Sequence, residues 1–310
     1  MNLPFDVLAV VGPTASGKTA LSTALAKSFN GEIINGDAMQ VYKELDIGTA
    51  KIHASEMNGI PHHFFDVKEP TESFSVAEYQ QAVRQWIADI QSRGKLPIIV
   101  GGSGMYVQSV LFDYRFTEQA ADSEVRARLE QELEAKGADV LHARLTELDP
   151  KSSEKIHPNN HRRLVRALEI LEVTGLTKQD HEKQSGNQPM YRSLIIGLDL
   201  PRELLYERID LRVEQMVEAG LFKEVQKLWD KGIRQTQSVQ AIGYKELISY
   251  FDGKLTKEQS IEAVMKNTRN YAKRQLTYFC NKLPVQWVNA NQSTEEIFQA
   301  TCKIIKDFQK

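Results

Sequence analysis

The residues most suited to chemistry form a glycine-bounded octapeptide near the N-terminus, Gly12-Pro13-Thr14-Ala15-Ser16-Gly17-Lys18-Thr19. It matches the pattern G-x-x-x-x-G-K-[S/T] at every fixed position. The glycines let the backbone curl so that successive N–H groups point at phosphate oxygens, and the helix that follows adds its positive N-terminus. In this pattern Lys18 reaches the terminal phosphate and the Thr19 hydroxyl ligates Mg²⁺. The motif predicts a diphosphate or triphosphate ligand without specifying the reaction.

Two further polar residues follow short apolar segments that are typical of buried strands. Asp37 comes after residues 32–35, and Ser103 comes after residues 96–100. In an open α/β sheet, ligands lie at the carboxyl edge of the strands. A carboxylate at that edge is placed to act as a general base, although a loop acid that caps the next turn is the alternative. The Ser103 hydroxyl is placed to donate to a ligand that its neighbouring glycines let come close, and a plain strand-to-helix turn is the alternative.

The segment before Ser103 also bears on which class of reaction the protein catalyses. A motor or switch NTPase carries a metal-binding Asp at the end of an apolar strand. Here the strand ends in Val100-Gly101-Gly102 and has no acid. This weighs against an ATP-hydrolysing machine. A small-molecule or nucleoside kinase with Asp37 as its base remains an alternative, as does an ATP-coupled binding or switch protein.

The pattern of apolar residues predicts the elements that position these groups. Short strands alternate with amphipathic helices in the first hundred residues, which is typical of parallel βαβ units with right-handed crossovers. The predicted strands are 6–11, 32–35, 96–100, 193–199 and 285–288, and a helix is predicted over about 75–93. Between 113 and 192 only helical periodicity appears, in three leucine-rich runs. We therefore expect an α/β fold with a P-loop NTPase-like parallel sheet core, residues 1–112 plus 193–310, interrupted by an all-helical insertion domain, residues 113–192.

Composition excludes several classes of protein. The 310 residues are 41% hydrophobic and 26% charged, enough apolar material for globular domains of about 100–200 residues each. Two cysteines cannot support a disulfide scaffold, and no apolar run approaches the roughly 18 residues of a membrane span. The N-terminus lacks the basic region of an export signal. We expect a cytoplasmic protein that makes no membrane contact.

Eight stretches of the sequence are residues 12–19, 36–42, 46–51, 61–63, 101–106, 161–169, 241–246 and 268–275. Together they resemble the bacterial tRNA dimethylallyltransferase (tRNA isopentenyltransferase) family. They occur in family order from about residue 8 to residue 288, so the resemblance covers nearly the whole chain. Ser103 stands where the family often has Thr, and Ala38 stands where Ser commonly flanks the Asp; two lone cysteines exclude the zinc finger of the eukaryotic relatives.

The resemblance implies transfer of a dimethylallyl group from dimethylallyl diphosphate to N6 of the adenosine 3′-adjacent to the anticodon in tRNA. The octapeptide then holds the diphosphate of the prenyl donor, with Mg²⁺ on Thr19. By family analogy Asp37 accepts the proton of the adenine amine, and Ser103 and an arginine stabilise the leaving diphosphate. Arg208 and Arg212 are four residues apart on one helix face, and the resemblance favours Arg212.

The resemblance also implies the surface that contacts the tRNA anticodon stem-loop. The helical insertion and the loops around Asp37 and residue 240 are expected to share that contact, and the protein is expected to be a monomer. As a bare charge cluster, the insertion arginines fit a solvated helix face equally well. The implied tRNA-binding residues are Asp37, Ala38, Met39, Gln40, Ser103, Arg126, His161, Arg162, Arg163, Leu164, Val165, Arg166, Gln240, Gly243, Tyr244 and Lys245.

The net charge of -2 looks unfavourable for RNA binding, because phosphate contacts usually need a basic surface. The balance is uneven along the chain, however. Residues 263–294 hold five Lys and Arg and no acid, and residues 155–166 hold four and no acid. A bound RNA interacts with the local charge of the surface that it contacts and not with the net charge of the chain. We therefore expect tRNA affinity to rest on local patches and to depend moderately on salt.

Overall fold

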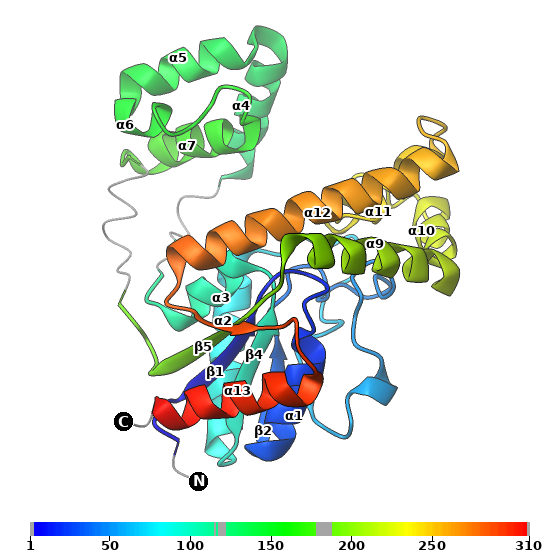
Figure 1. The fold of residues 1–310 in the computed structure, drawn as a ribbon. Coiled ribbons are helices and arrows are strands. Elements are labelled where there is room, and N and C mark those ends of the chain that lie inside the picture. Colours follow the sequence, from blue (N-terminus) through cyan, green and yellow to red (C-terminus); the bar gives the residue numbers. More distant parts are fainter. Residues whose placement is uncertain (1–2, 115, 117–121, 178–187, 309–310) are drawn as a thin grey trace. The chain divides into compact units, whose positions relative to one another are not determined.

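The computed structural model describes residues 3–114, 116, 122–177 and 188–308, which fall into two compact units. The first unit comprises Met1–Leu111 and Pro189–Lys310, and the second comprises Phe112–Gln188 (Figure 1). Residues 189–192 belong to the first unit because the Met190 N–H donates to the Leu111 carbonyl, and the Arg192 carbonyl accepts from Asp6 N–H at 2.7 Å. Residues 178–187, which belong to the expected insertion, lie outside the described residues.

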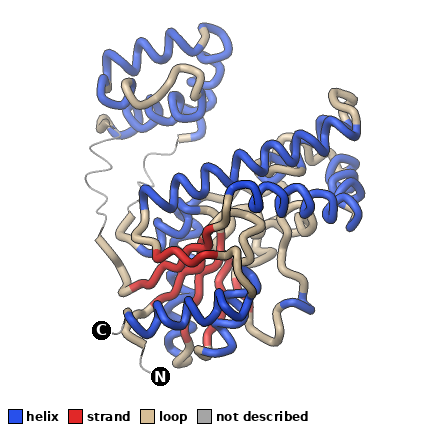
Figure 2. Tube along the Cα trace, in the orientation of Figure 1, coloured by secondary structure: helices blue, strands red, loops and turns tan. Residues whose placement is uncertain are grey.

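The first unit is built on a six-stranded sheet in which every pair of neighbouring strands is parallel, in the order β3-β2-β4-β1-β5-β6. All five residues of β1 are buried, as the continuous apolar run predicts for a strand covered on both faces. Figure 2 shows the strands in red, enclosed by helices. The strands are β1 (Val7–Val11), β2 (Gly31–Asn35), β3 (His62–His63), β4 (Leu96–Gly101), β5 (Ser193–Asp199) and β6 (Gln286–Asn289).

Helices cover both faces of this sheet, and two long ones, α9 and α12, run side by side beyond its carboxyl edge (Figure 1). Helix α1 packs against α13, and its Leu21 and Leu25 join Leu8 and Ile196 in the core. The helices are α1 (Lys18–Ser28), α2 (Val76–Ser92), α3 (Gly104–Leu111), α9 (Arg202–Ala219), α10 (Leu221–Asp230), α11 (Tyr244–Phe251), α12 (Lys257–Lys282) and α13 (Thr294–Asp307), with 3₁₀ turns at Ala54–Glu56 and Ser238–Gln240.

The second unit has its own hydrophobic core, formed by the leucines whose helical spacing marked the insertion. Leu129, Leu141, Leu145, Leu164 and Leu168 are all fully buried there. The helices are α4 (Ser123–Lys136), α5 (Ala138–Leu148), α6 (Pro150–Ser153) and α7 (His161–Thr174).

The α/β fold with a parallel core is confirmed, and two short elements were missed. Strand β3 has only two residues, which is too few to show any periodicity. Helix α6 begins at Pro150 and is too short to be one of the three leucine-rich runs that the sequence predicted. Proline is tolerated at the first helical position because no N–H is needed there, and the Asp149 carboxylate caps the turn by accepting from Ser152 N–H.

Among the described residues, no helix has the length and apolar content needed to cross a membrane.

Candidate active site

The phosphate loop joins the buried strand β1 to helix α1 and adopts the curled backbone that its sequence predicts. Gly12 and Gly17 have φ angles of 144° and 94°, and Ala15 also lies in the left-handed region at 63°. A Cβ on Gly12 would stand 3.0 Å from the Leu198 carbonyl oxygen. The Ser16 hydroxyl closes the curl by donating to the Pro13 carbonyl at 2.8 Å. Residues 12–19 therefore form a preshaped loop at the centre of the sheet edge.

Lys18 lies inside this loop, with its ammonium group held by the loop's own backbone. Its Nζ donates to the carbonyl oxygens of Gly12 at 3.1 Å and Pro13 at 2.6 Å. Burial, and to a smaller extent the nearby Arg212 guanidinium, lower the pKa of Lys18 to about 7, against the opposing effect of Asp37. Burial and the neighbouring Arg212 both disfavour the charged form of Lys18. An anionic ligand would stabilise that charged form.

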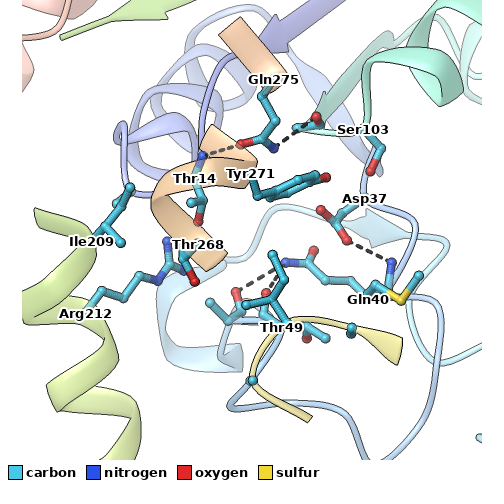
Figure 3. A pocket seen from close by; sticks show the side chains of 18 of the residues that line it. Thr14, Asp37, Gln40, Thr49, Ser103, Ile209, Arg212, Thr268, Tyr271 and Gln275 are labelled. Carbon is cyan, nitrogen blue, oxygen red and sulfur yellow. Dashed lines mark hydrogen bonds between the residues drawn. The ribbon is translucent and has the colours of Figure 1, made fainter. Parts of the chain in front are cut away.

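Asp37 follows β2 and faces the same space as the phosphate loop (Figure 3). One carboxylate oxygen, Oδ1, accepts from Met39 N–H at 2.8 Å, so the group stabilises its own turn as well as pointing into the cavity. Burial raises the pKa of this carboxyl, against the opposing effects of backbone N–H groups and of Lys18 and Arg212. A carboxylate with a raised pKa is better suited to accept a proton.

The loop after β4 was expected to use its glycines to let a ligand come close, and Gly101 and Gly102 do line the cavity. The spaces that side chains would take at these two positions are not open to a ligand, however. Protein atoms occupy those spaces. A Cβ on Gly101 would lie 2.1 Å from the Gly36 backbone, and one on Gly102 would lie 2.0 Å from the Gln275 side-chain amide. The glycines let three loops pack together. Ser103 joins two of them, because its Oγ accepts from Ala38 N–H at 3.1 Å.

Arg208 and Arg212, the two candidate arginines of α9, lie in different places. Arg212 lines the same cavity as Lys18 and Asp37, and burial lowers the pKa of its guanidinium. Arg208 lines a separate small hollow beside Gln292. The structure thus brings Arg212, the arginine that the resemblance favoured, to the phosphate loop.

The cavity has a volume of about 380 Å³ and is lined by described residues of the first unit alone. Sequence reasoning missed its wall on α12, where Thr268, Tyr271, Arg274 and Gln275 line the space (Figure 3). Three of these recur at the spacing of one helix face, and all four lie in the last family-like stretch. The helix-face spacing within a family-like stretch was the sequence signal that could have identified these four residues. Tyr271 lies beside Ser103 and Gln275 (Figure 3).

A second group of residues shapes the side of the cavity opposite the phosphate loop. Gln40 Nε2 donates to the carbonyls of Thr49 at 3.0 Å and Ala50 at 3.3 Å. Met39, Gln40, Gln240, Gly243 and Lys245 line the cavity, as do Ala38 and Ser103.

Tyr244 was expected in the tRNA-binding set, but its side chain is fully buried and does not line the cavity. Its hydroxyl donates to Glu224 at 2.5 Å. The same carboxylate accepts from the backbone N–H groups of Asp46, Ile47 and Gly48 at 2.8–3.1 Å. A Cβ on Gly48 would collide with the Tyr244 ring at 2.5 Å. Glu224 and Tyr244 therefore hold the 46–50 loop against the cavity.

The expected tRNA contacts in the second unit divide into exposed and buried residues. His161, Arg162 and Arg163 open helix α7 and are exposed. Leu164 and Val165 pack into the hydrophobic core of the unit, because their positions on α7 face inward.

The remaining two arginines of that set share one partner. Arg126 and Arg166 both pair with the fully buried carboxylate of Glu169, at 2.8 Å in each case.

Thr19 was expected to ligate Mg²⁺, and its side chain is exposed at the first turn of α1. The described residues contain no group of three or more His, Cys, Asp or Glu suited to hold a metal ion. Mg²⁺ in phosphate sites is commonly bound by one or two protein oxygens plus substrate phosphates and water. A single hydroxyl beside the phosphate loop fits that kind of site.

The chain resembles known proteins over almost its full length. A family model described as IPP transferase matches residues 40–282. Curated tRNA dimethylallyltransferases of Bacillus licheniformis and Bacillus subtilis are each 54% identical to it, over 94% and 92% of this chain and 95% and 91% of their own. A solved tRNA isopentenylpyrophosphate transferase of Bacillus halodurans superposes with a TM-score of 0.73 at 46% identity, over 98% of this chain and 97% of that one. A eukaryotic dimethylallyltransferase acting on tRNA gives 0.82 at 31% identity, over 97% and 79%.

Proposed function

The chain belongs to the IPP transferase family and is a tRNA-modifying prenyltransferase, and we propose that transfer takes place in the cavity between the phosphate loop and Asp37. The enzyme moves a dimethylallyl group from dimethylallyl diphosphate to N6 of the adenosine 3′-adjacent to the anticodon and releases diphosphate. The observation that carries this proposal is that a diphosphate-binding loop and a carboxylate of raised pKa line one cavity. The family assignment decides against the kinase alternative.

The phosphate loop binds the diphosphate of the prenyl donor. Pro13 has no N–H, and the Thr14 N–H donates to Gln275, so the backbone donors that face the phosphates come from Ala15 to Thr19. Lys18 and Arg212 add positive charge from two sides of the cavity. As the C1–O bond breaks, the leaving diphosphate takes the electron pair, and these cations stabilise the charge that develops on it.

Thr19 would hold Mg²⁺ together with the phosphates. The ion supplies further positive charge to the leaving diphosphate.

Asp37 acts on the acceptor. The lone pair of an exocyclic adenine amine is delocalised into the ring, so the amine is a weak nucleophile. The Asp37 carboxylate accepts a hydrogen bond from N6 and takes its proton as the N6–C1 bond forms. The raised pKa of Asp37 favours this proton transfer. The Ser103 hydroxyl lies at the same edge and donates toward the diphosphate.

The tRNA partner must present its adenosine outside the base stack for N6 to reach this cavity. Single-stranded loop bases are the usual targets of such readers. We propose that Asp37–Gln40, Gln240, Gly243 and Lys245 contact the target nucleotide, and that His161, Arg162 and Arg163 contact the anticodon arm from the helical unit. We propose that the protein acts as a monomer, and the tRNA substrate supports action in the cytoplasm.

The proposal is tested by incubating the protein with radiolabelled dimethylallyl diphosphate and unmodified tRNA, with and without excess ATP. We expect label to appear in the tRNA and diphosphate to be released in equal amount. ATP turnover with no label in the tRNA would contradict the assignment.

A further inference from the structure

Gln275 is a buried side chain that bridges two loops of the cavity. It lies on α12, is only 4% exposed, and uses both ends of its amide. Its Oε1 accepts from the Thr14 N–H of the phosphate loop at 3.0 Å, and its Nε2 donates to the Gly102 carbonyl beside Ser103 at 3.0 Å (Figure 3). One side chain therefore connects the loop that holds the leaving group to the loop that carries a reactive hydroxyl.

Gly102 packs directly against the Gln275 amide. A Cβ on Gly102 would lie 2.0 Å from the Gln275 Nε2, so glycine at that position is required for the amide to sit where it does. Oxygen and nitrogen of the amide are assigned by their partners: an N–H faces Oε1, and a carbonyl faces Nε2. A carboxylate could satisfy only the first of these contacts.

The loop after β4 also contacts the residues on either side of Asp37. The Ser103 Oγ accepts from the Ala38 N–H, which is next to Asp37 in the chain. The Gly36 N–H donates to the Val100 carbonyl at 2.8 Å, and the Ser103 N–H donates to the Gly36 carbonyl at 3.3 Å. Contacts thus run from the phosphate loop through Gln275 and the β4 loop to the segment that carries the base.

We propose that Gln275 is a positioning residue that fixes the distance between the diphosphate and the acceptor side of the cavity. The proposal rests on the function proposed above. Gln275 faces backbone at both ends, so it is expected to act on the alignment of the two reactants more than on the affinity for either one. Misplacement of reacting groups by about 1 Å lowers rates by about a hundredfold.

The test uses Gln275→Glu and Gln275→Ala in the full chain, with Gln226→Glu as the matched control. Gln226 is an exposed residue of α10. We expect kcat to fall about a hundredfold in both Gln275 variants, because the side chain no longer hydrogen-bonds to both loops. The KM for each substrate should change by less than about threefold, because misalignment of the two reactants slows the chemical step and does not weaken substrate binding. Gln226→Glu should match the wild type.

The Glu variant gives a pH signature, measured at pH values where both proteins stay folded. At high pH its second oxygen repels the Gly102 carbonyl, whereas on protonation the carboxylic acid donates to that carbonyl as the amide did. The activity of Gln275→Glu relative to the wild type should therefore rise as the pH falls. Taking the ratio removes the titration of Asp37, which both proteins share. A ratio that stays constant with pH would overturn the proposal.

A second pair of variants tests the same contact from the glycine side. Gly102→Ala places a methyl group against the Gln275 amide and should lower kcat. In the Gln275→Ala background that space is open, so the same substitution should cause a smaller loss. Equal losses in the two backgrounds would contradict the role of Gln275. If the wild type transfers no label to tRNA, the proposed function fails as well; if the wild type is active and the Gln275 variants match it, this inference alone fails.

Discussion

The side-chain amide of Asn35 holds the backbone of Asp37 at both of its polar groups. Asn35 Oδ1 accepts from the Asp37 N–H at 2.9 Å, and Nδ2 donates to the Asp37 carbonyl at 3.0 Å. Asn35 is fully buried at the end of β2, and its Nδ2 also donates to the Phe64 carbonyl at 3.2 Å. The residue proposed as the base is therefore fixed to the edge of the sheet.

Removing the carboxylate should separate chemistry from binding. Asp37→Asn keeps the shape of the side chain and loses the proton acceptor, so kcat should fall by about a hundredfold to ten-thousandfold. The affinity for tRNA should stay close to that of the wild type. Single-turnover transfer and filter binding measure the two quantities. An affinity that falls in parallel with the rate would make Asp37 a binding residue instead of the base.

The lowered pKa of Lys18 predicts a pH dependence for capture of the prenyl donor. In the free enzyme Lys18 loses its charge as the pH rises through about 7. The charged form binds the diphosphate, so kcat/KM for dimethylallyl diphosphate should fall above that pH. Bound diphosphate stabilises the ammonium, and kcat should therefore hold to a higher pH. Steady-state kinetics between pH 6 and 9 measure both profiles.

A variant of the neighbouring cation checks the cause of this profile. Arg212→Gln removes a positive charge that lowers the pKa of Lys18, so the falling part of the kcat/KM profile should move to higher pH. Burial, the larger cause, remains, and the shift should be partial. Arg208→Gln, outside the cavity, should leave the profile in place. A flat wild-type profile would show that Lys18 does not control capture of the donor.

Glu224 should stabilise the 46–48 loop, because both of its carboxylate oxygens accept hydrogen bonds from backbone N–H groups of that loop. Glu224→Gln turns an NH₂ group toward backbone N–H donors, and we expect the free energy of unfolding to fall by about 1–3 kcal/mol. Tyr244→Phe removes only the hydroxyl contact and should cost about 0.5–1.5 kcal/mol. Urea denaturation measures both. A larger loss for Tyr244→Phe than for Glu224→Gln would contradict this assignment.

The basic residues should differ in their effect on the salt dependence of tRNA binding. Arg163 is exposed at the start of α7, whereas Arg269 on α12 pairs with Asp210 at 2.5 Å. Arg163→Ala should reduce the slope of log affinity against log salt by about 1, the value for one lost phosphate contact. Arg269→Ala should change the slope less. Equal changes, or a wild-type slope as steep as that of a broadly basic protein, would refute the local-patch account.

The phosphate loop could be predicted from the sequence because its chemistry is local. Eight consecutive residues carry the loop, and β1 and α1 on either side are marked by their own apolar patterns. Asp37 and Ser103 could be placed at one edge for a similar reason, since the carboxyl ends of parallel strands meet there.

Contacts between distant segments could not be predicted in this way. Gln275 and Thr14 are 261 positions apart, and Glu224 and Gly48 are 176 apart. Periodicity shows which face of a helix is apolar and gives no indication of which loop that face meets. The family resemblance placed Tyr244 at the RNA surface, and nothing in the sequence showed that its hydroxyl contacts Glu224, 20 positions away.

The central claim is that one cavity carries the prenyl donor and the base that activates the adenine amine. The most direct measurement is nucleoside analysis by mass spectrometry of unmodified tRNA after one round of reaction with the wild type and with Asp37→Asn. We predict N6-dimethylallyladenosine at the position 3′-adjacent to the anticodon with the wild type, and almost none in the same time with the variant while both substrates remain bound. Equal modification by the two proteins, or modification at another position, would contradict the account.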